Sequence, residues 1–383
     1  MRKSILAWAI VGALSIPLAS QADTILYGSA RVSIDYDDQS DDFTKNNWDV
    51  VNNSSRLGVL GTEDLGGGLS AIYQYEFGVD LTEGGNWNSN RPKFVGLKGD
   101  FGTLSIGTQE TPYYHVSGIV DIFNSSKTFV TTQTLGAGLS FSQDRNFSSG
   151  DLVRLDNSVY YSTPDFNGFT GEAMLVMNGS CGGESTLCVK EDTNALPDAS
   201  KDIDAWNISG KYANGPFFAG LSYFKLDGKD NVLVTVIDDY PVTIDLDLDL
   251  WTVGLGYNVG PFSFGFIYEQ GDMTTLNLIR NMKIAGYAPF TGDDAKNWFL
   301  TGQYVFGDNT VRAAYGQLDT GIDGEKNIDN YLVGYQYNFS KRTSLWVEYI
   351  GRNAKLYNVP GDSSTAKVLG DQNSFSIGTR VDF

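Results

Sequence analysis

Polar and apolar residues alternate along many short segments of this chain. Residues 29–36 read Ser-Ala-Arg-Val-Ser-Ile-Asp-Tyr, so every second residue is apolar. The same period of two returns near residues 70–77, 262–269, 331–339, 344–349 and 374–383. Because a β-strand points successive side chains to opposite faces, this pattern predicts strands with one apolar face and one wet face.

The connections between these segments alternate between tight turns and longer polar stretches. Asn214-Gly215-Pro216 and Gly307-Asp308-Asn309 are tight turns, whereas residues 111–152 form a long connection. Alternating connection lengths are typical of transmembrane β-barrels with short periplasmic turns and long external loops. A soluble β-sandwich would share the alternation of residues but not that of the connections. The sequence therefore predicts an all-β, 16-stranded antiparallel transmembrane β-barrel, with strands near residues 24–36, 53–63, 69–79, 90–99, 103–109, 153–163, 168–178, 203–212, 217–226, 246–258, 261–270, 296–306, 309–318, 328–339, 342–351 and 373–383.

The first 22 residues are expected to lie outside this fold. Arg2 and Lys3 precede an apolar run from Ser4 to Leu18, and small residues stand at Ser20 and Ala22. This is the anatomy of a cleavable signal peptide, and the run is shorter than the roughly 20 residues that a spanning helix needs. We predict a signal peptide over residues 1–22 and a single barrel over residues 23–383.

Composition and charge narrow the function. The chain has 21 Tyr and 22 Phe, which suit strands and the aromatic girdles of barrels. Its net charge of −19 argues against nucleic acid as a partner, because phosphates attract Lys and Arg. We expect no cofactor and no metal site, since the single histidine, His115, stands far from both cysteines. In an exported chain, Cys181 and Cys188 favour a small disulfide loop over free or metal-binding thiols.

Several motifs together resemble one known family. They lie in the first strands, after the long connection and near the C-terminus, and read Leu26-Tyr27-Gly28, Ser55-Arg56-Leu57-Gly58, Gly61-Thr62-Glu63-Asp64-Leu65-Gly66, Phe94-Val95-Gly96-Leu97-Lys98-Gly99, Asn157-Ser158-Val159-Tyr160-Tyr161 and Phe339-Ser340-Lys341-Arg342-Thr343. The chain resembles the trimeric general diffusion porins of Gram-negative outer membranes, of the neisserial and related proteobacterial type. That resemblance implies a homotrimer in outer-membrane lipid and lipopolysaccharide. It also implies passive diffusion of small hydrophilic solutes and ions, and a third loop folded into the barrel.

Four arginines are candidates for the basic wall of a pore constriction. The alternation directs Arg31, Arg56 and Arg154 into the lumen, and the resemblance adds Arg91. Arginine suits this role because it stays charged and offers a planar fork of donors. Lys93 shares the inward face unless Pro92, which cannot donate a ladder hydrogen bond, interrupts the strand.

The acidic side of the constriction is expected to comprise Glu76, Asp121 and Asp144. Glu76 aligns with an acid of the family, and the two aspartates stand on the third loop. His115 is interpreted as an ordinary residue of that loop.

Three other functions compete with general diffusion. A channel specific for one solute, such as an anion, would keep the fold and is compatible with the arginines. An enzyme is disfavoured, because the chain has one histidine and no Gly-x-Ser-x-Gly motif for a nucleophile and its base. An anchoring barrel would carry a soluble domain, and no linker to one is present.

Overall fold

The computed structural model describes residues 23–39, 47–84, 87, 91–126, 134–138, 152–177, 203–227, 232–237, 240–244, 247–272, 283–284, 292–353, 357–358, 367–368 and 371–383. The signal peptide predicted over residues 1–22, the pair Cys181 and Cys188, and Asp144 lie outside these ranges. Within them, no helix has the length and apolar character needed to cross a membrane.

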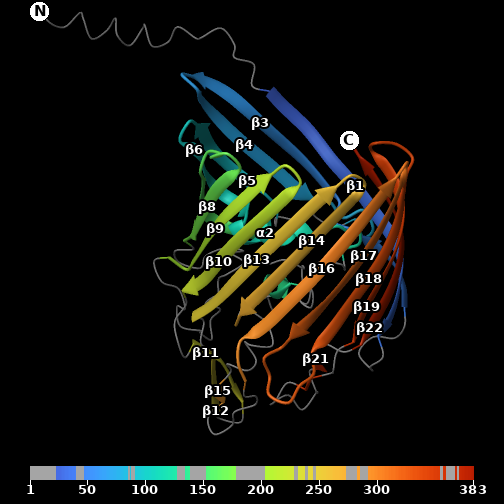
Figure 1. Ribbon diagram of the computed structural model, residues 1–383. Helices are drawn as coiled ribbons and strands as arrows, with labels where there is room; N and C mark the ends of the chain where they lie inside the picture. The colour runs from blue at the N-terminus through green and yellow to red at the C-terminus, as the bar shows by residue number, and fades with distance from the viewer. Residues whose placement is uncertain are drawn as a thin grey trace, which may run out of the picture.

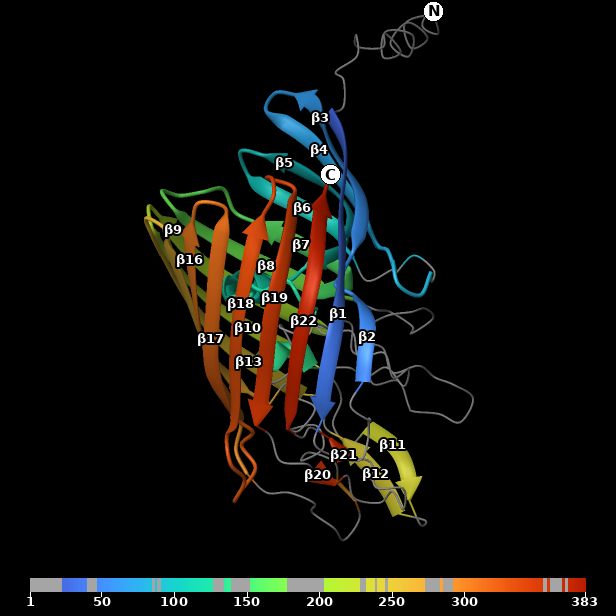
Figure 2. The ribbon, with the colours of Figure 1, turned by 90° about the vertical axis from the view of Figure 1, so that its right-hand side faces the viewer.

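Sixteen antiparallel strands close into one barrel in the described part of the chain, as predicted (Figures 1 and 2). Each strand pairs with the next along the chain, and the last pairs with the first. The strands are β1 (Asp23–Gln39), β2 with β3 (Asn47–Asn52 and Arg56–Gly66), β4 (Leu69–Gly78), β5 (Lys93–Gly99), β6 (Gly102–Glu110), β7 (Arg154–Ser162), β8 (Phe169–Val176), β9 (Ala205–Asn214), β10 (Phe217–Asp227), β13 (Asp247–Val259), β14 (Phe262–Gly271), β16 (Ala295–Phe306), β17 (Asn309–Asp319), β18 (Ile328–Asn338), β19 (Thr343–Asn353) and β22 (Gln372–Asp382).

The second strand differs from its predicted course over residues 53–63. It is longer and is interrupted at residues 53–55, so that β2 and β3 pair with the two halves of β1. Ser54 takes a positive φ of 61°, a conformation that few residues other than glycine adopt. Asn53 and Ser55 still bind Arg31 of β1 through hydrogen bonds, so the barrel stays closed across the break.

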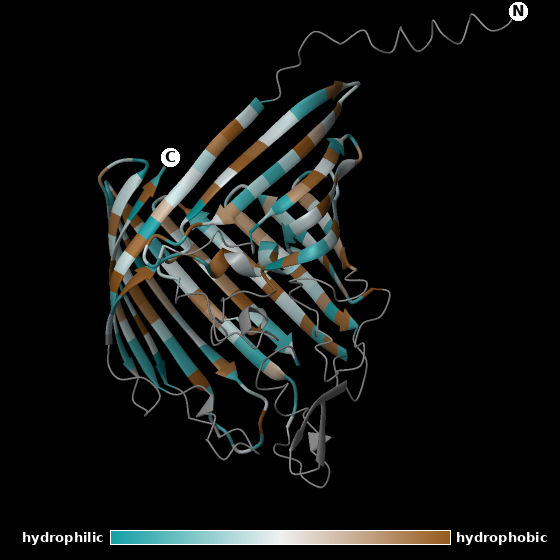
Figure 3. Cartoon of the chain, turned by 180° about the vertical axis from the view of Figure 1, so that it is seen from behind, coloured by the Kyte–Doolittle hydropathy of each residue, from teal (hydrophilic) through white to brown (hydrophobic). Residues whose placement is uncertain are grey.

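The two faces of the strands differ as the alternation predicts. In β17, Val311 and Tyr315 are exposed on the outside, whereas Thr310 and Arg312, on either side of Val311, are buried on the inside. Figure 3 shows the same banding of hydrophilic and hydrophobic residues along most strands. An apolar exterior around a polar interior is the arrangement expected of a barrel that meets lipid.

The short turns lie at one end of the barrel, together with the start of the first strand and the end of the last. Phe383 and Gly28 exchange backbone hydrogen bonds of 2.9 and 3.1 Å there, next to turns such as Gly99–Gly102. Small additional strands lie beyond the opposite end, in segments for which loops were expected (Figure 2). They are β11 (Val232–Ile237), β12 (Tyr240–Ile244), β15 (Lys283–Ile284), β20 (Tyr357–Asn358) and β21 (Lys367–Val368).

The third long connection, residues 111–153 between β6 and β7, is called loop L3 below. Its described part contains helix α2 (Pro112–Ser117) and the 3-10 turns η1 (Gly118–Val120) and η2 (Leu135–Gly138). Val116 and Ile119 of L3 lie against the inner-wall glycines Gly254 and Gly265. The loop is therefore folded into the barrel, beside β10, β13 and β14 (Figure 1).

Candidate functional site

Loop L3 enters the lumen through a capped helix. The side chain of Thr111 accepts a hydrogen bond of 3.1 Å from the Tyr114 N–H, and its hydroxyl donates to the Leu152 carbonyl at 2.5 Å. Pro112 follows at the first helical position, where its missing N–H costs nothing. One threonine therefore starts α2 and ties the beginning of L3 to its end.

Two buried carboxylates of the barrel wall hold L3 across the lumen. Glu269 of β14 accepts hydrogen bonds from the Tyr113 hydroxyl at 2.8 Å and from the Leu135 N–H at 2.9 Å. Glu348 of β19 accepts from the N–H groups of Asn124 and Ser125, each at 2.8 Å. L3 is thus fixed at points on two separate strands.

Glu76 gathers two of the predicted arginines on the opposite wall. Its carboxylate lies 3.7 Å from Arg56 Nε and 3.3 Å from Arg91 NH1. Arg91 also donates to the Ser54 carbonyl at 3.2 Å, at the interruption between β2 and β3. The break in the second strand therefore supplies an acceptor that holds Arg91 in place.

The other two predicted arginines extend the same wall. Arg154 at the start of β7 lies 3.8 Å from Glu110 at the end of β6. Arg31 donates to the Ser29 hydroxyl at 2.8 Å and lies within the electrostatic field of Arg56. Arg56, Arg91 and Arg154 line one recess together with Glu76 and Glu110.

On the L3 side, Asp121 is exposed and accepts a hydrogen bond of 3.0 Å from the Tyr114 hydroxyl. The positive charges of Arg154 and Arg31 both act on it. Asp121 therefore lies within the electrostatic reach of two of the arginines, and its role on the acidic side of a constriction stays a prediction. Asp144, the second predicted loop acid, lies outside the described residues.

Comparison with known proteins agrees with this architecture. A family model described as Gram-negative porin matches residues 7–352. The chain belongs to this family. An outer membrane porin protein of Bordetella pertussis is 27% identical over 98% of this chain and all of the relative. The major outer membrane protein P.IB of Neisseria gonorrhoeae is 25% identical over 91% of this chain and 92% of the relative.

Solved structures share the fold of this porin. An anion-selective porin from Comamonas acidovorans superposes with a TM-score of 0.67 at 21% identity, covering 95% of this chain and all of that one. OmpT of Vibrio cholerae, in a trimer form, gives 0.59 at 19% identity over 94% of this chain and 99% of that one. This porin is therefore a passive diffusion channel of the outer membrane, and its relatives are channels rather than enzymes.

Lys93 does not share the lumen of the porin with Arg91. Its ammonium group lies 4.9 Å from the centre of the Phe77 ring, and Lys93 pairs with Tyr75, whose side chain is exposed on the outside. Strand β5 begins only after Pro92, whose carbonyl accepts a hydrogen bond from the backbone N–H of Glu76. The interruption expected at Pro92 is confirmed, and it turns Arg91 and Lys93 to opposite faces.

His115 is the residue of the porin site that sequence reasoning missed. Interpreting it as an ordinary loop residue was wrong, because its ring lies 3.1 Å from Glu172 on β8 and 3.8 Å from Glu110 on β6. Burial disfavours the charged ring, but hydrogen bonds to Glu110 and Glu172 outweigh it and raise the pKa of His115 to about 9. His115 therefore adds a positive charge beside Arg154 at neutral pH. The sequence carries no signal for this, since both partners come from barrel strands.

Metal binding has no support in the described part of the porin. Those residues contain no group of three or more His, Cys, Asp or Glu side chains arranged to hold an ion. The acidic residues of the site are instead shared with Arg, Lys or His.

Proposed function

We propose that this porin passes small hydrophilic solutes and ions with a bias toward anions. The observation that supports this proposal is an excess of positive over negative side chains at the arginine wall. Among the described residues, five cations, Arg56, Arg91, Arg154, His115 and Lys211, share three carboxylates, Glu76, Glu110 and Glu172. Arg31 extends the wall beyond them, so the mouth of the recess carries excess positive charge.

Asp121 opposes that wall and completes a transverse field. A lumen with low-dielectric walls focuses such a field, and charged clusters at a narrow point bias which ions pass. Salt screens the solvent-exposed acidic residues elsewhere on the chain, so that each affects a passing ion only within a Debye length of about 8 Å at physiological salt. The nearest fixed charges therefore outweigh the acidity of the whole chain. The anion selectivity named for the Comamonas acidovorans structure is consistent with this proposal.

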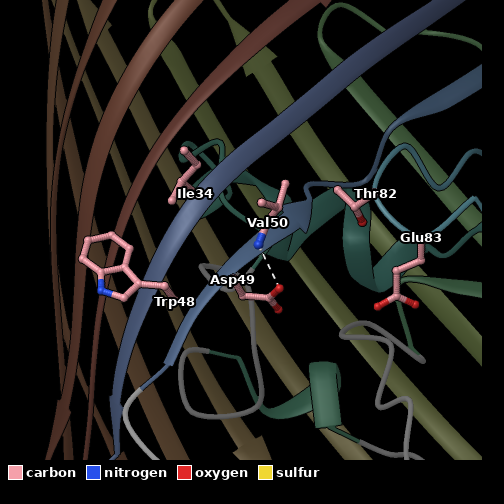
Figure 4. Close-up of a pocket in the computed structure, with 6 residues that line it drawn as sticks. All are labelled: Ile34, Trp48, Asp49, Val50, Thr82 and Glu83. Carbon is pink, nitrogen blue, oxygen red and sulfur yellow. Dashed lines mark hydrogen bonds between the residues drawn. The ribbon is translucent and has the colours of Figure 1, made fainter.

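We further propose that the porin is a homotrimer joined through β1, β2 and the loop after β4. A recess of about 380 Å³ on the outside of the barrel combines exposed Trp48, Val50 and Ile34 with polar Thr82 and Glu83 (Figure 4). Asp80 fixes that loop by accepting hydrogen bonds from the N–H groups of Thr82 and Glu83, which lower its pKa. A rigid, mixed polar and apolar surface suits a protein neighbour better than lipid tails.

The remaining parts of the proposal follow from the family. The signal peptide over residues 1–22 is removed before Asp23, the short turns face the periplasm, and lipid with lipopolysaccharide surrounds the apolar exterior outside the trimer contact. The lumen performs no chemistry. A channel dedicated to one nutrient is the alternative, and it would show saturable transport of that solute alone.

The reversal potential in a potassium chloride gradient tests the selectivity. For the purified porin in a planar bilayer, we expect a reversal potential with the sign of the chloride equilibrium potential. Arg154→Gln should move the reversal potential toward potassium, whereas Arg342→Gln, in an exposed turn between β18 and β19, should leave it unchanged. Equal shifts in both variants would show that total charge, rather than the constriction, sets the preference.

A further inference from the structure

The recess under the arginine wall is not wholly polar. It has a volume of about 370 Å³, within the range of small-molecule sites, and Arg56, Arg91 and Arg154 line it together with Ile72, Phe94 and Tyr160. Ile72 and Phe94 occupy inward positions on β4 and β5, between the polar Gln74, Glu76 and Ser105. Apolar side chains at inward positions of a water-filled lumen are exceptional and call for an explanation.

Packing of L3 does not explain these apolar residues. L3 packs through two buried apolar clusters, and among the described residues neither cluster contains Ile72 or Phe94. Both side chains keep part of their surface accessible. The neighbouring inward positions Gly96 and Gly107 add no side chain to the recess, because a Cβ atom at either position would lie within 3 Å of the backbone of the adjacent strand. With respect to the described residues, the apolar surface of Ile72 and Phe94 therefore stays open to the lumen.

Cationic and apolar groups are arranged on different sides of this recess. Strand β4 runs from the end with short turns toward L3, so Ile72 lies nearer that end and Glu76 nearer the arginines. Phe94 pairs with Gln74, which is the inward residue of β4 next to Glu76 on the side of the short turns. A ligand with a carboxylate at one end and a ring at the other would place each part against a matching wall.

We infer that this recess is a subsite for small aromatic carboxylates, which bind with the carboxylate at Arg91 and Arg154 and the ring over Ile72 and Phe94. The inference rests on the proposed anion bias and adds the class of anion that is favoured. Arginine forks match carboxylates bidentately, and burying a ring's apolar surface adds affinity that a short-chain acid lacks.

Block of the chloride current by benzoate, acetate and benzyl alcohol tests the subsite on the purified porin in bilayers. Benzoate is expected to halve the current at a concentration roughly fivefold lower than acetate does, because only benzoate buries a ring. Benzyl alcohol, which has the ring without the charge, should block as weakly as acetate. Equal half-blocking concentrations for benzoate and acetate would overturn the subsite.

Two variants separate the subsite from the general selectivity. Phe94→Ser should remove the advantage of benzoate over acetate and keep the chloride preference; Ile72→Ser is a second test should the first variant not assemble. Phe218→Ser is the matched control, because Phe218 lies beside Gly220 and Gly256 on the far wall. Retention of the benzoate advantage in Phe94→Ser and Ile72→Ser would contradict the inference. Loss of chloride preference in the wild type would instead contradict the proposed anion bias.

Discussion

At the scale of single residues, the constriction depends on sharing carboxylates among cations. Glu76 serves both Arg56 and Arg91, and Glu110 serves both Arg154 and His115. A guanidinium offers five donors, so each arginine keeps donors for water and solutes after one ion pair is made. Lysine at these positions would keep the charge but lose the planar fork.

The charge on His115 predicts a pH dependence of selectivity. Its pKa of about 9 exceeds the ordinary value of 6.5, so the ring is charged at pH 7 and loses its charge as the pH rises through 9. The stability that the ion pairs with Glu110 and Glu172 contribute is fully present below pH 6.5 and is lost as the pH rises through about 9. Chloride preference should therefore fall between pH 7 and pH 10, as measured by reversal potential.

His115→Gln is the control for this effect. The variant should show a weaker chloride preference at pH 7 and a smaller change up to pH 10, because it lacks the ring that loses its charge over that range. Identical pH profiles for the variant and the wild type would exclude His115 as the titrating group.

The residues of the site differ in how far sequence could predict them. The alternation of faces and the family motifs together predict Arg56 and Arg154, although β3 begins at Arg56 and a register shift separates Arg154 from Ser158. Arg91 required the family resemblance, because Pro92 breaks the alternation that would otherwise place it. His115 could not be found, since Glu172 lies 57 residues away and only the closed barrel brings the two together.

At the scale of elements, loop L3 fits the barrel through close backbone contact. A Cβ atom at Gly254 would lie 2.6 Å from the Val116 carbonyl oxygen, and one at Gly265 would lie 2.7 Å from the Ile119 carbonyl oxygen. Glycines on β13 and β14 therefore leave the room that L3 occupies. Strand periodicity predicted these strands but gave no reason for their glycines, because that reason lies in L3.

Gly254→Ala should consequently displace L3. The added methyl group meets backbone rather than a flexible side chain, and overpacking of this kind costs about 1–3 kcal/mol. We expect a changed single-channel conductance and a lower thermal unfolding temperature. Gly302→Ala is the matched control, because a Cβ there meets the Phe264 ring at an ordinary 3.7 Å. Unchanged conductance in Gly254→Ala would mean that L3 is not seated on this glycine.

The interruption in the second strand shows where prediction of elements ends. Residues 53–63 are predicted as one strand, although Asn52-Asn53-Ser54-Ser55 is a run of residues that favour turns. In the barrel, Asn53 instead accepts a hydrogen bond of 2.8 Å from the N–H of Ser126 in L3, and Ser54 offers its carbonyl to Arg91. Contacts with distant segments therefore stabilise the break, and local sequence does not show which segments supply them.

At the scale of the whole molecule, an acidic protein can still favour anions. The net charge of −19 is spread over the whole chain, whereas Arg56, Arg91 and Arg154 line one recess of the barrel. Charges separated by more than about 8 Å of physiological salt solution are largely screened from a passing ion. Total composition therefore predicted the absence of nucleic-acid binding, but it could not predict the sign of the selectivity.

The outside of the barrel carries the last prediction, which concerns assembly. Trp48 and Trp251 are both exposed on the exterior, but only Trp48 lies in the recess with Asp49, Thr82 and Glu83 (Figure 4). If β1 and β2 form the trimer contact, Trp48→Ser removes a large buried anchor, which can cost about 2 kcal/mol or more per interface. Trp251→Ser removes an equal side chain from a wall that meets lipid. Light scattering in detergent should show smaller species for Trp48→Ser than for Trp251→Ser, and dissociation of both variants alike would place the contact elsewhere on the barrel.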